Sequence, residues 1–214
     1  MSRAERVQVG IGWVIRGVLA YEAIFAGVAT NWPVAFTAVM ALAASFLPAL
    51  LERNLRLQLP IEFELIIVFF VFATLFLGEG RSFYARFGWW DNALHTGSGV
   101  VMGFVGFLVL YTLQQHERLQ MKPMLLCTFS FAFALAAATL WEIFEFTMDS
   151  TFGFTMQKSG LDDTMADLIV GGAGAMFAVG TGYLFLVRRH APLGWFEYML
   201  ERYFDENPED PKPS

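Results

Sequence analysis

Residues 141–174 read WEIFEFTMDSTFGFTMQKSGLDDTMADLIVGGAG, and this stretch indicates both the fold and the place of a site. It joins the end of one long apolar segment to the start of another. Six acids lie at the facing ends of these segments: Glu142, Glu145, Asp149, Asp162, Asp163 and Asp167. Acidic side chains in or beside membrane helices are energetically costly, so they indicate function unless a partner neutralises them.

A second stretch, DNALHTGSGVVMGFVG at residues 91–106, adds a histidine and another acid. Asp91 and His95 are four residues apart, so they share one face of a helix. The two stretches together predict a carboxylate–histidine site embedded in a membrane.

The composition is that of a polytopic membrane protein. Of the 214 residues, 56% are hydrophobic and 16% are charged, and the mean hydropathy is +0.50; soluble domains carry about 25% charged residues. A formal charge of −6 and the lack of a basic run argue against a nucleic-acid partner. The single cysteine, Cys127, excludes an intramolecular disulfide and a multi-cysteine metal site.

The first apolar segment is predicted to be a retained helix. Arg16 and Glu22 interrupt it, and it is longer than the ~7–15-residue core of a signal peptide.

Six apolar segments approach the length of about 20 residues that a bilayer span needs. We expect these membrane helices at about 9–29, 33–51, 61–78, 90–113, 123–148 and 165–187. The predicted fold is all-α, a bundle of about six transmembrane helices within residues 1–190. Residues 191–204 mix aromatic and charged side chains, which suits a short helix at the membrane surface. The acidic, proline-rich residues 205–214 are expected to be disordered.

The lysines and arginines beside the helix ends predict the orientation. Three lie on one side of the predicted bundle, namely Arg81, Arg86 and Lys158. Eight lie on the other side: Arg3, Arg6, Arg53, Arg56, Arg118, Lys122, Arg188 and Arg189. The more basic side faces the cytoplasm, so both termini are predicted to be cytoplasmic and the acids are predicted to lie toward the outer face.

Helical spacing places acids and the histidine at matching depths on three predicted helices. The expected metal ligands are Asp91, His95, Glu142, Glu145, Asp149, Asp163 and Asp167. The expected catalytic residues among them are His95, Glu142, Glu145 and Asp167. Asp163 also suits the N-cap of the last span.

Several carboxylates cannot all ionise close together in a poorly solvated place unless a cation compensates them. Carboxylate oxygens with one imidazole suit a divalent ion such as Mg²⁺, Mn²⁺ or Zn²⁺. Such an ion can polarise a phosphoryl or carbonyl oxygen or activate water. Without a metal, Glu145 and His95 would instead form a proton acceptor–donor pair.

Glycines are predicted to bring helices together near this site. Gly99 and Gly103 form a GxxxG pattern that Gly106 extends, and residues 171, 172 and 174 are also glycines. Small residues let helix backbones approach closely in lipid.

Three segments carry a resemblance to a known family: FGWWDNALHTGSGVVMGFVGF at 87–107, WEIFEFTMDSTFG at 141–153 and MQKSGLDDTMADLIVGGAGA at 156–175. They resemble the YjdF family of bacterial inner-membrane proteins, over about residues 50–190. The resemblance implies a multi-pass protein of the bacterial inner membrane and no particular activity.

The chain is more distantly similar to the VanZ-like group, which is linked to glycopeptide resistance and envelope biology. Asp91 and His95 match its D-K-x-x-H segment, Glu142 matches the acid of its E-x-x-Q motif, and Asp167 matches its D-x-x-x-N-x-x-G motif. The chain departs from these motifs where Asn92, Glu145 and Gly171 replace the lysine, the glutamine and the asparagine.

The leading hypothesis is an envelope protein whose outward-facing site binds a cation and a lipid, lipid-linked or small anionic ligand, with or without catalysis. One alternative is a proton- or cation-coupled transporter. Another is a non-catalytic membrane partner whose acids organise the bundle. The substrate, the identity of the metal and the oligomeric state are not specified by the sequence.

Overall fold

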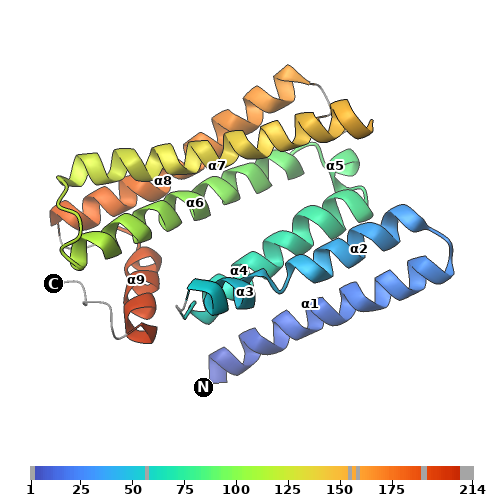
Figure 1. Cartoon of the computed structure of the whole chain (residues 1–214), viewed down its shortest axis with the longest axis horizontal. Coiled ribbons are helices and arrows are strands. Elements are labelled where there is room, and N and C mark those ends of the chain that lie inside the picture. The colour runs from blue at the N-terminus through green and yellow to red at the C-terminus, as the bar shows by residue number, and fades with distance from the viewer. Residues whose placement is uncertain (1–2, 56–57, 154–155, 158–159, 189–191, 208–214) are drawn as a thin grey trace. The chain divides into compact units, whose positions relative to one another are not determined.

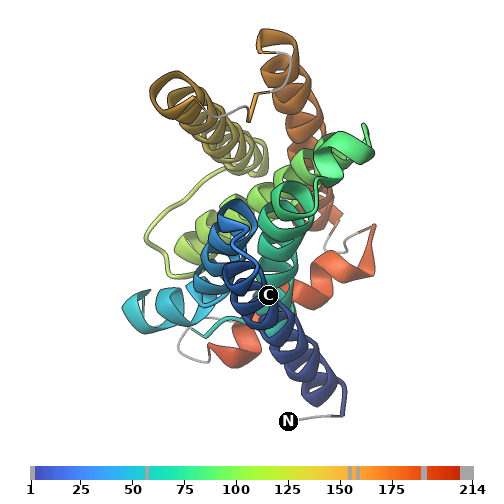
Figure 2. The same ribbon diagram turned by 90° about the vertical axis from the view of Figure 1, so that its right-hand side faces the viewer.

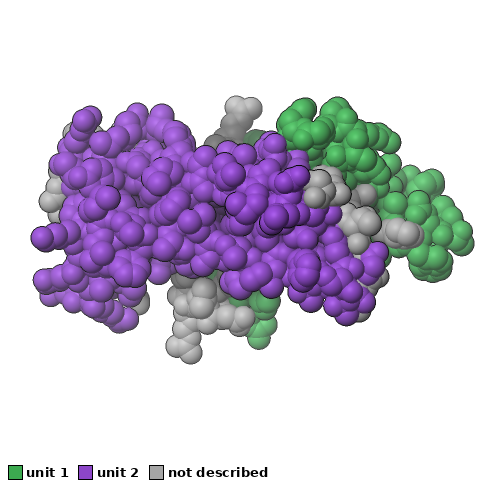
Figure 3. All heavy atoms as spheres, turned by 90° about the horizontal axis from the view of Figure 1, so that it is seen from above, with its two compact units in different colours: residues 1–90, 205–207 green, residues 91–204, 208–214 purple. Residues whose placement is uncertain are grey.

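The computed structural model describes residues 3–55, 58–153, 156–157, 160–188 and 192–207, and all regular structure in these residues is helical. The chain divides into two compact units (Figure 3). The first comprises residues 1–90 with 205–207, and the second comprises residues 91–204 with 208–214. The all-α prediction is confirmed.

The first unit contains α1 (Arg3–Val28), α2 (Trp32–Ala44), α3 (Leu47–Leu55), α4 (Ile61–Val71), the π-helix η1 (Phe72–Gly80) and α5 (Phe83–Arg86). Figures 1 and 2 show α1 and α2 running side by side after a tight turn. A small apolar core lies between α1, α2 and η1, with Leu19, Ala38, Ala41 and Phe76 buried.

The second unit contains α6 (Trp90–Gln115), α7 (Pro123–Phe152), α8 (Leu161–Arg188) and α9 (Gly194–Glu206). Figure 1 shows α6, α7 and α8 running alongside one another, with α9 crossing near one end. The face of α9 that includes Phe196 is buried, and the Phe196 ring packs edge-on against Phe104 and Phe107 of α6.

The described residues contain five helices that are long and apolar enough to cross a membrane, where about six were expected. These spans are Arg6–Val28, Ile61–Gly78, Trp90–Gln115, Pro123–Thr151 and Leu161–Arg188. They establish a multi-pass helical membrane protein. The interfacial position predicted for residues 191–204 stays a prediction, and the segment expected to be disordered contributes Asp205 and Glu206 to the end of α9.

The predicted continuous span at 33–51 is wrong, because two shorter helices, α2 and α3, occupy this segment. Pro48 has no N–H to donate to the carbonyl group of Ala44, so an α-helix cannot continue unbroken through this point. Arg16 of α1 binds Ser45, the residue that follows α2. Its Nη2 donates to the Ser45 carbonyl oxygen at 2.8 Å, and its Nε donates to Ser45 Oγ at 3.3 Å.

The two charges that interrupt the first span each have an opposite partner. Arg16 Nη2 lies 2.9 Å from Glu64 Oε1 of α4, and Glu22 Oε1 lies 2.7 Å from Arg81 Nη2, just beyond η1. Arg16 and Glu22 are both only 8% exposed. A buried charge is strongly destabilising without its partner, so these pairs favour one arrangement of α1 against α4 and η1.

Candidate functional site

Three helices of the second unit bring four of the predicted site residues together. α6 carries Asp91 in its first turn and His95 one turn later, while α7 carries Glu142 and α8 carries Asp167. His95 Nε2 lies 3.5 Å from Asp91 Oδ1 and 3.7 Å from Asp167 Oδ2. His95 Nδ1, on the other side of the ring, lies 4.0 Å from Glu142 Oε1. One imidazole therefore has carboxylates near both of its nitrogens.

Glycines explain why α6 and α8 approach closely enough for this arrangement. Gly99 follows His95 by one helical turn, and Gly171 follows Asp167 by one turn. A Cβ atom at Gly99 would overlap the backbone carbonyl group of Gly171. The predicted glycine-mediated packing is thus present, and it lies one turn from the contact between His95 and Asp167.

The acids around His95 are largely withdrawn from solvent. Asp167 is 2% exposed and Glu142 is 4% exposed, while Asp91 and His95 are half-buried. The distances of 3.5–4.0 Å from the imidazole nitrogens exceed those of ordinary hydrogen bonds. The three carboxylates therefore lie close to the imidazole nitrogens of His95 without forming ordinary hydrogen bonds to them.

Glu142 is the most unusual member of the group. Neither of its carboxylate oxygens has a hydrogen-bond partner among the described residues, although both are buried. Burying a carboxylate without compensation costs several kcal/mol in order of magnitude. The Nδ1 atom of the His95 ring lies 4.0 Å from one of these oxygens.

Glu145 lies beside this group and makes a different contact. Its Oε1 accepts a hydrogen bond from Trp141 Nε1, one turn earlier on α7, at 2.9 Å. The carboxyl group is buried and close enough to Glu142, Asp91 and Asp167 to interact with their charges. Its ligand atoms are not part of the compact cluster formed by Asp91, His95 and Asp167.

Asp149 organises the connection after α7. Its two carboxylate oxygens accept hydrogen bonds from the backbone N–H groups of Met156 and Gln157 at 2.8 and 2.9 Å. The Gln157 side chain in turn donates to Thr164 Oγ1 of α8 at 2.7 Å. Asp149, in the last turn of α7, therefore binds the backbone of the loop that follows.

Asp163 also lies outside the cluster around His95. The prediction that it is an N-cap is wrong, because α8 begins at Leu161 and Asp163 lies within its first turn. The helix starts four residues earlier than the expected start at residue 165. The Thr164 N–H already donates to the Gly160 carbonyl oxygen at 3.1 Å.

Gln157 also lies beside the site, although the sequence did not indicate it. Besides Thr164, its Nε2 donates to the backbone carbonyl oxygen of Glu142 at 3.4 Å. This side chain thereby connects the loop to α7 beside the buried carboxylate. A single glutamine in a polar loop carries no distinguishing signal, so only the fold reveals its position.

The geometry suits a divalent cation at Asp91, His95 and Asp167. One ligand atom from each of these residues lies within 4.8 Å of the others. Oxygen and nitrogen ligands at about 2.0–2.2 Å from one ion lie about 3–4 Å apart, so modest side-chain rotations would bring the three atoms into range. Glu142 faces the other ring nitrogen, where a carboxylate commonly orients a metal-binding histidine.

Comparison with known proteins identifies relatives by sequence. The chain is 28% identical over 124 residues to an uncharacterized protein of Thermotoga maritima, covering 58% of this chain and 63% of the relative. No solved structure matches. A family model described as "Predicted membrane protein (DUF2238)" matches residues 11–188. Since this match spans most of the chain, and the YjdF family is the same family, the protein belongs to the DUF2238 family of membrane proteins.

Proposed function

We propose that this protein binds a divalent cation through Asp91, His95 and Asp167 and uses the ion to hold or transform a lipid or lipid-linked ligand of the bacterial envelope. The observation that carries the proposal is the position of His95. Its Nε2 faces Asp91 and Asp167, whereas its Nδ1 faces Glu142. A metal-binding histidine with a carboxylate on its second nitrogen has this same arrangement.

The charge balance favours a cation. Asp91, Asp167 and Glu142 would carry three negative charges if all were ionised, and Asp167 and Glu142 are almost completely buried. Several carboxylates in one poorly solvated place need protons or a cation to compensate them. A divalent ion bound beside His95 would supply two positive charges against these carboxylates.

The depth of the site favours a ligand that is part of the membrane. Asp91 is the second residue of α6, and Asp167 lies about 9 Å along α8 from its first residue. This depth is close to the boundary between lipid head groups and the hydrocarbon core. A cation there can be reached by a phosphate or carbonyl oxygen of a lipid.

The proposed chemistry assigns separate roles to the residues. Asp91, His95 and Asp167 hold the ion, Glu142 orients the imidazole, and Glu145 is the nearby acid for proton transfer. The bound ion would polarise a phosphoryl or carbonyl oxygen or activate water. The distribution of lysine and arginine supports a site open to the outer face of the inner membrane.

The similarity to the VanZ-like group supports this proposal. Four residues carry it: His95 and the three acids near its imidazole ring, Asp91, Glu142 and Asp167. The shared positions support a cation site but do not specify a substrate.

The proposal is tested by the metal content of the full chain, purified in detergent without chelators and equilibrated with Mg²⁺, Mn²⁺ or Zn²⁺. We expect about one ion per chain and at least a tenfold loss of affinity in Asp167→Asn. Asp162→Asn is the matched control, because Asp162 is an exposed acid on the same helix. Unchanged metal binding in Asp167→Asn would overturn the cation site.

A second arm tests the ligand. Nanodiscs of bacterial phospholipids would be prepared with and without the preferred ion, and the lipid retained on the protein would be measured by native mass spectrometry. The proposal predicts lipid retention that depends on both the ion and Asp167. Lipid retention that depends on neither the ion nor Asp167 would show that the lipid is not the ligand of this site.

A further inference from the structure

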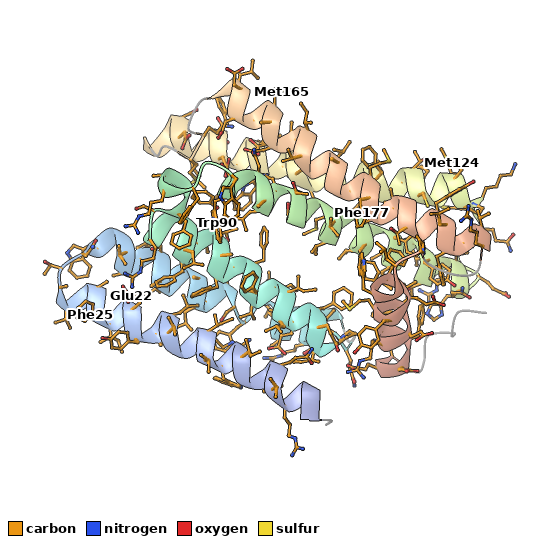
Figure 4. All side chains as sticks on the ribbon, turned by 180° about the vertical axis from the view of Figure 1, so that it is seen from behind. Glu22, Phe25, Trp90, Met124, Met165 and Phe177 are labelled. Carbon is orange, nitrogen blue, oxygen red and sulfur yellow. The ribbon has the colours of Figure 1, made fainter. Side chains whose placement is uncertain are left out.

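A cavity of about 340 Å³ lies within the first unit, and none of its lining residues belongs to the proposed cation site. Its polar lining comes from Glu22 of α1, Asn31 in the turn after α1, and Arg81, Ser82 and Arg86 after η1. Figure 4 shows Glu22 and Phe25 in the last turns of α1, near its connection to α2. The cavity therefore belongs to one end of the first unit.

The cavity lies at the ends of two membrane spans. One span ends at Val28 and the other at Gly78, while Asn31, Arg81 and Arg86 come shortly after these ends in the chain. Trp32, next to the cavity in sequence, is 68% exposed, as is typical of tryptophan at a membrane interface. The polar lining is thus expected at the depth of lipid head groups.

Arg81 is held in place at this cavity by two contacts. Its Nη2 lies 2.7 Å from Glu22 Oε1, and its guanidinium carbon lies 5.3 Å from the centre of the Phe76 ring. The Arg81 side chain nevertheless stays 49% exposed. Because the guanidinium group is already oriented, a further ligand on its open side would lose little conformational entropy in binding it.

Arg86 gives the cavity an excess of positive charge. Glu22 carries one negative charge, whereas Arg81 and Arg86 carry two positive charges, which leaves the charged lining at +1. The ion pair alone would account for Arg81 but not for a second arginine on the same cavity. Arginine is the side chain best suited to bind phosphate, because its planar donors match two phosphate oxygens.

We propose that this cavity binds a phosphate-bearing anion, with Arg81 and Arg86 donating to the phosphate oxygens and Glu22 holding Arg81 in position. The anion is either the head group of a phospholipid or free phosphate, since both present the same oxygens. This site is independent of the cation site, because the two share no residue.

The test uses the full chain in detergent and two probes, phosphatidylglycerol and inorganic phosphate. Binding is followed by native mass spectrometry for the lipid and by the shift of the unfolding temperature for phosphate. Arg86→Gln should weaken phosphatidylglycerol binding at least tenfold. Arg118→Gln, which changes an exposed arginine of the second unit, should leave it unchanged.

A double variant tests Arg81 without leaving an unpaired buried charge that could cause misfolding. Arg81→Gln alone would leave Glu22 buried without its partner, whereas Glu22→Gln with Arg81→Gln replaces the ion pair by two neutral amides and keeps the lining at +1. This double variant should fold and should also lose at least tenfold in affinity, because the oriented guanidinium is gone.

The two probes separate the sources of the anion. Binding of both probes, with the same dependence on Arg86, would assign the site to phosphate itself, whereas binding of the lipid alone would assign it to a membrane head group. The proposal is overturned if neither probe binds, or if Arg86→Gln and the double variant bind as tightly as the native chain. Metal content measured on the same samples shows separately whether the cation site is intact.

Discussion

At the scale of single residues, two glutamates three positions apart on α7 have different surroundings. Glu142 faces the His95 ring and has no hydrogen bond to its oxygens within the described chain, whereas Glu145 accepts a hydrogen bond from Trp141. A difference of three positions rotates a side chain by about 60° around the helix axis. That rotation is enough to direct one carboxylate at α6 and to place the other beside the indole.

Glu142→Gln tests the orienting role. The glutamine keeps the size of the side chain and an oxygen acceptor facing the imidazole, while the variant removes a buried acid. We expect the folded protein to be at least as stable as the native chain, and the metal affinity to fall about 10–100-fold, as for other residues that orient a metal ligand. Metal titration and thermal unfolding measure the two effects. Native metal affinity would show that Glu142 does not act through His95.

Glu145→Gln should behave differently. The glutamine keeps an acceptor for Trp141 Nε1 and removes a negative charge close to Glu142, Asp91 and Asp167. We predict that the free energy of unfolding stays the same or rises by up to about 1 kcal/mol, which thermal unfolding would measure. The metal content should stay close to that of the native chain. A variant that loses its ion would place Glu145 among the ligands.

Part of the site could be predicted from residue types and spacing. Asp91, His95, Glu142 and Asp167 were all expected, because acids and a histidine in apolar helices carry a clear signal. Asp149 and Asp163 were also expected to be ligands, and this stays a prediction. The hydrogen bonds from Asp149 to the backbone of Met156 and Gln157 were not predicted, because they depend on how the loop after α7 folds. The partners of Arg16 and Glu22 could not be predicted either, because no local pattern specifies which side chain of another helix they meet.

At the scale of helices, the approach of α6 to α8 brings His95 and Asp167 of the proposed cation site together. A Cβ atom at Gly174 would overlap the Thr96 carbonyl group of α6, whereas a Cβ atom at Gly97 would meet nothing within 4 Å. The same substitution therefore has opposite expected effects at two helical glycines.

Gly174→Ala should destabilise the protein by about 1–3 kcal/mol, because the extra methyl group forces the helices apart. It should also weaken metal binding, since α6 and α8 each carry ligands. Gly97→Ala is the matched control and should be neutral or slightly stabilising, because alanine favours a helix over glycine. Thermal unfolding and metal titration check both variants. Equal behaviour of the two would refute the role of close packing.

The helices themselves were largely predictable from apolar length, since the long spans appear where the composition placed them. In the segment at 33–51, Pro48 is a sequence signal for a break that apolar length alone does not register. The contact from Arg16 to the Ser45 carbonyl oxygen could not be predicted, because the two residues are distant in the chain. The π-helical end of the span that begins at Ile61 was also unexpected. Hydropathy measures how apolar a segment is and contains no information about hydrogen-bond register.

At the scale of the whole molecule, the eight-to-three asymmetry of lysine and arginine predicts the orientation. Reporter fusions after Arg53 and Arg118 should report the cytoplasm, and a fusion near Arg86 should report the exterior. The reversed pattern would place the cation site at the cytoplasmic face and would remove the proposal of an outward-facing site.

The most direct test of a cation held between α6 and α8 is electron paramagnetic resonance of the full chain titrated with Mn²⁺. We expect one saturable Mn²⁺ ion per chain, with a nitrogen coupling from the imidazole that disappears in His95→Ala. Mn²⁺ that binds without nitrogen coupling, or whose spectrum is the same in His95→Ala, would contradict this expectation.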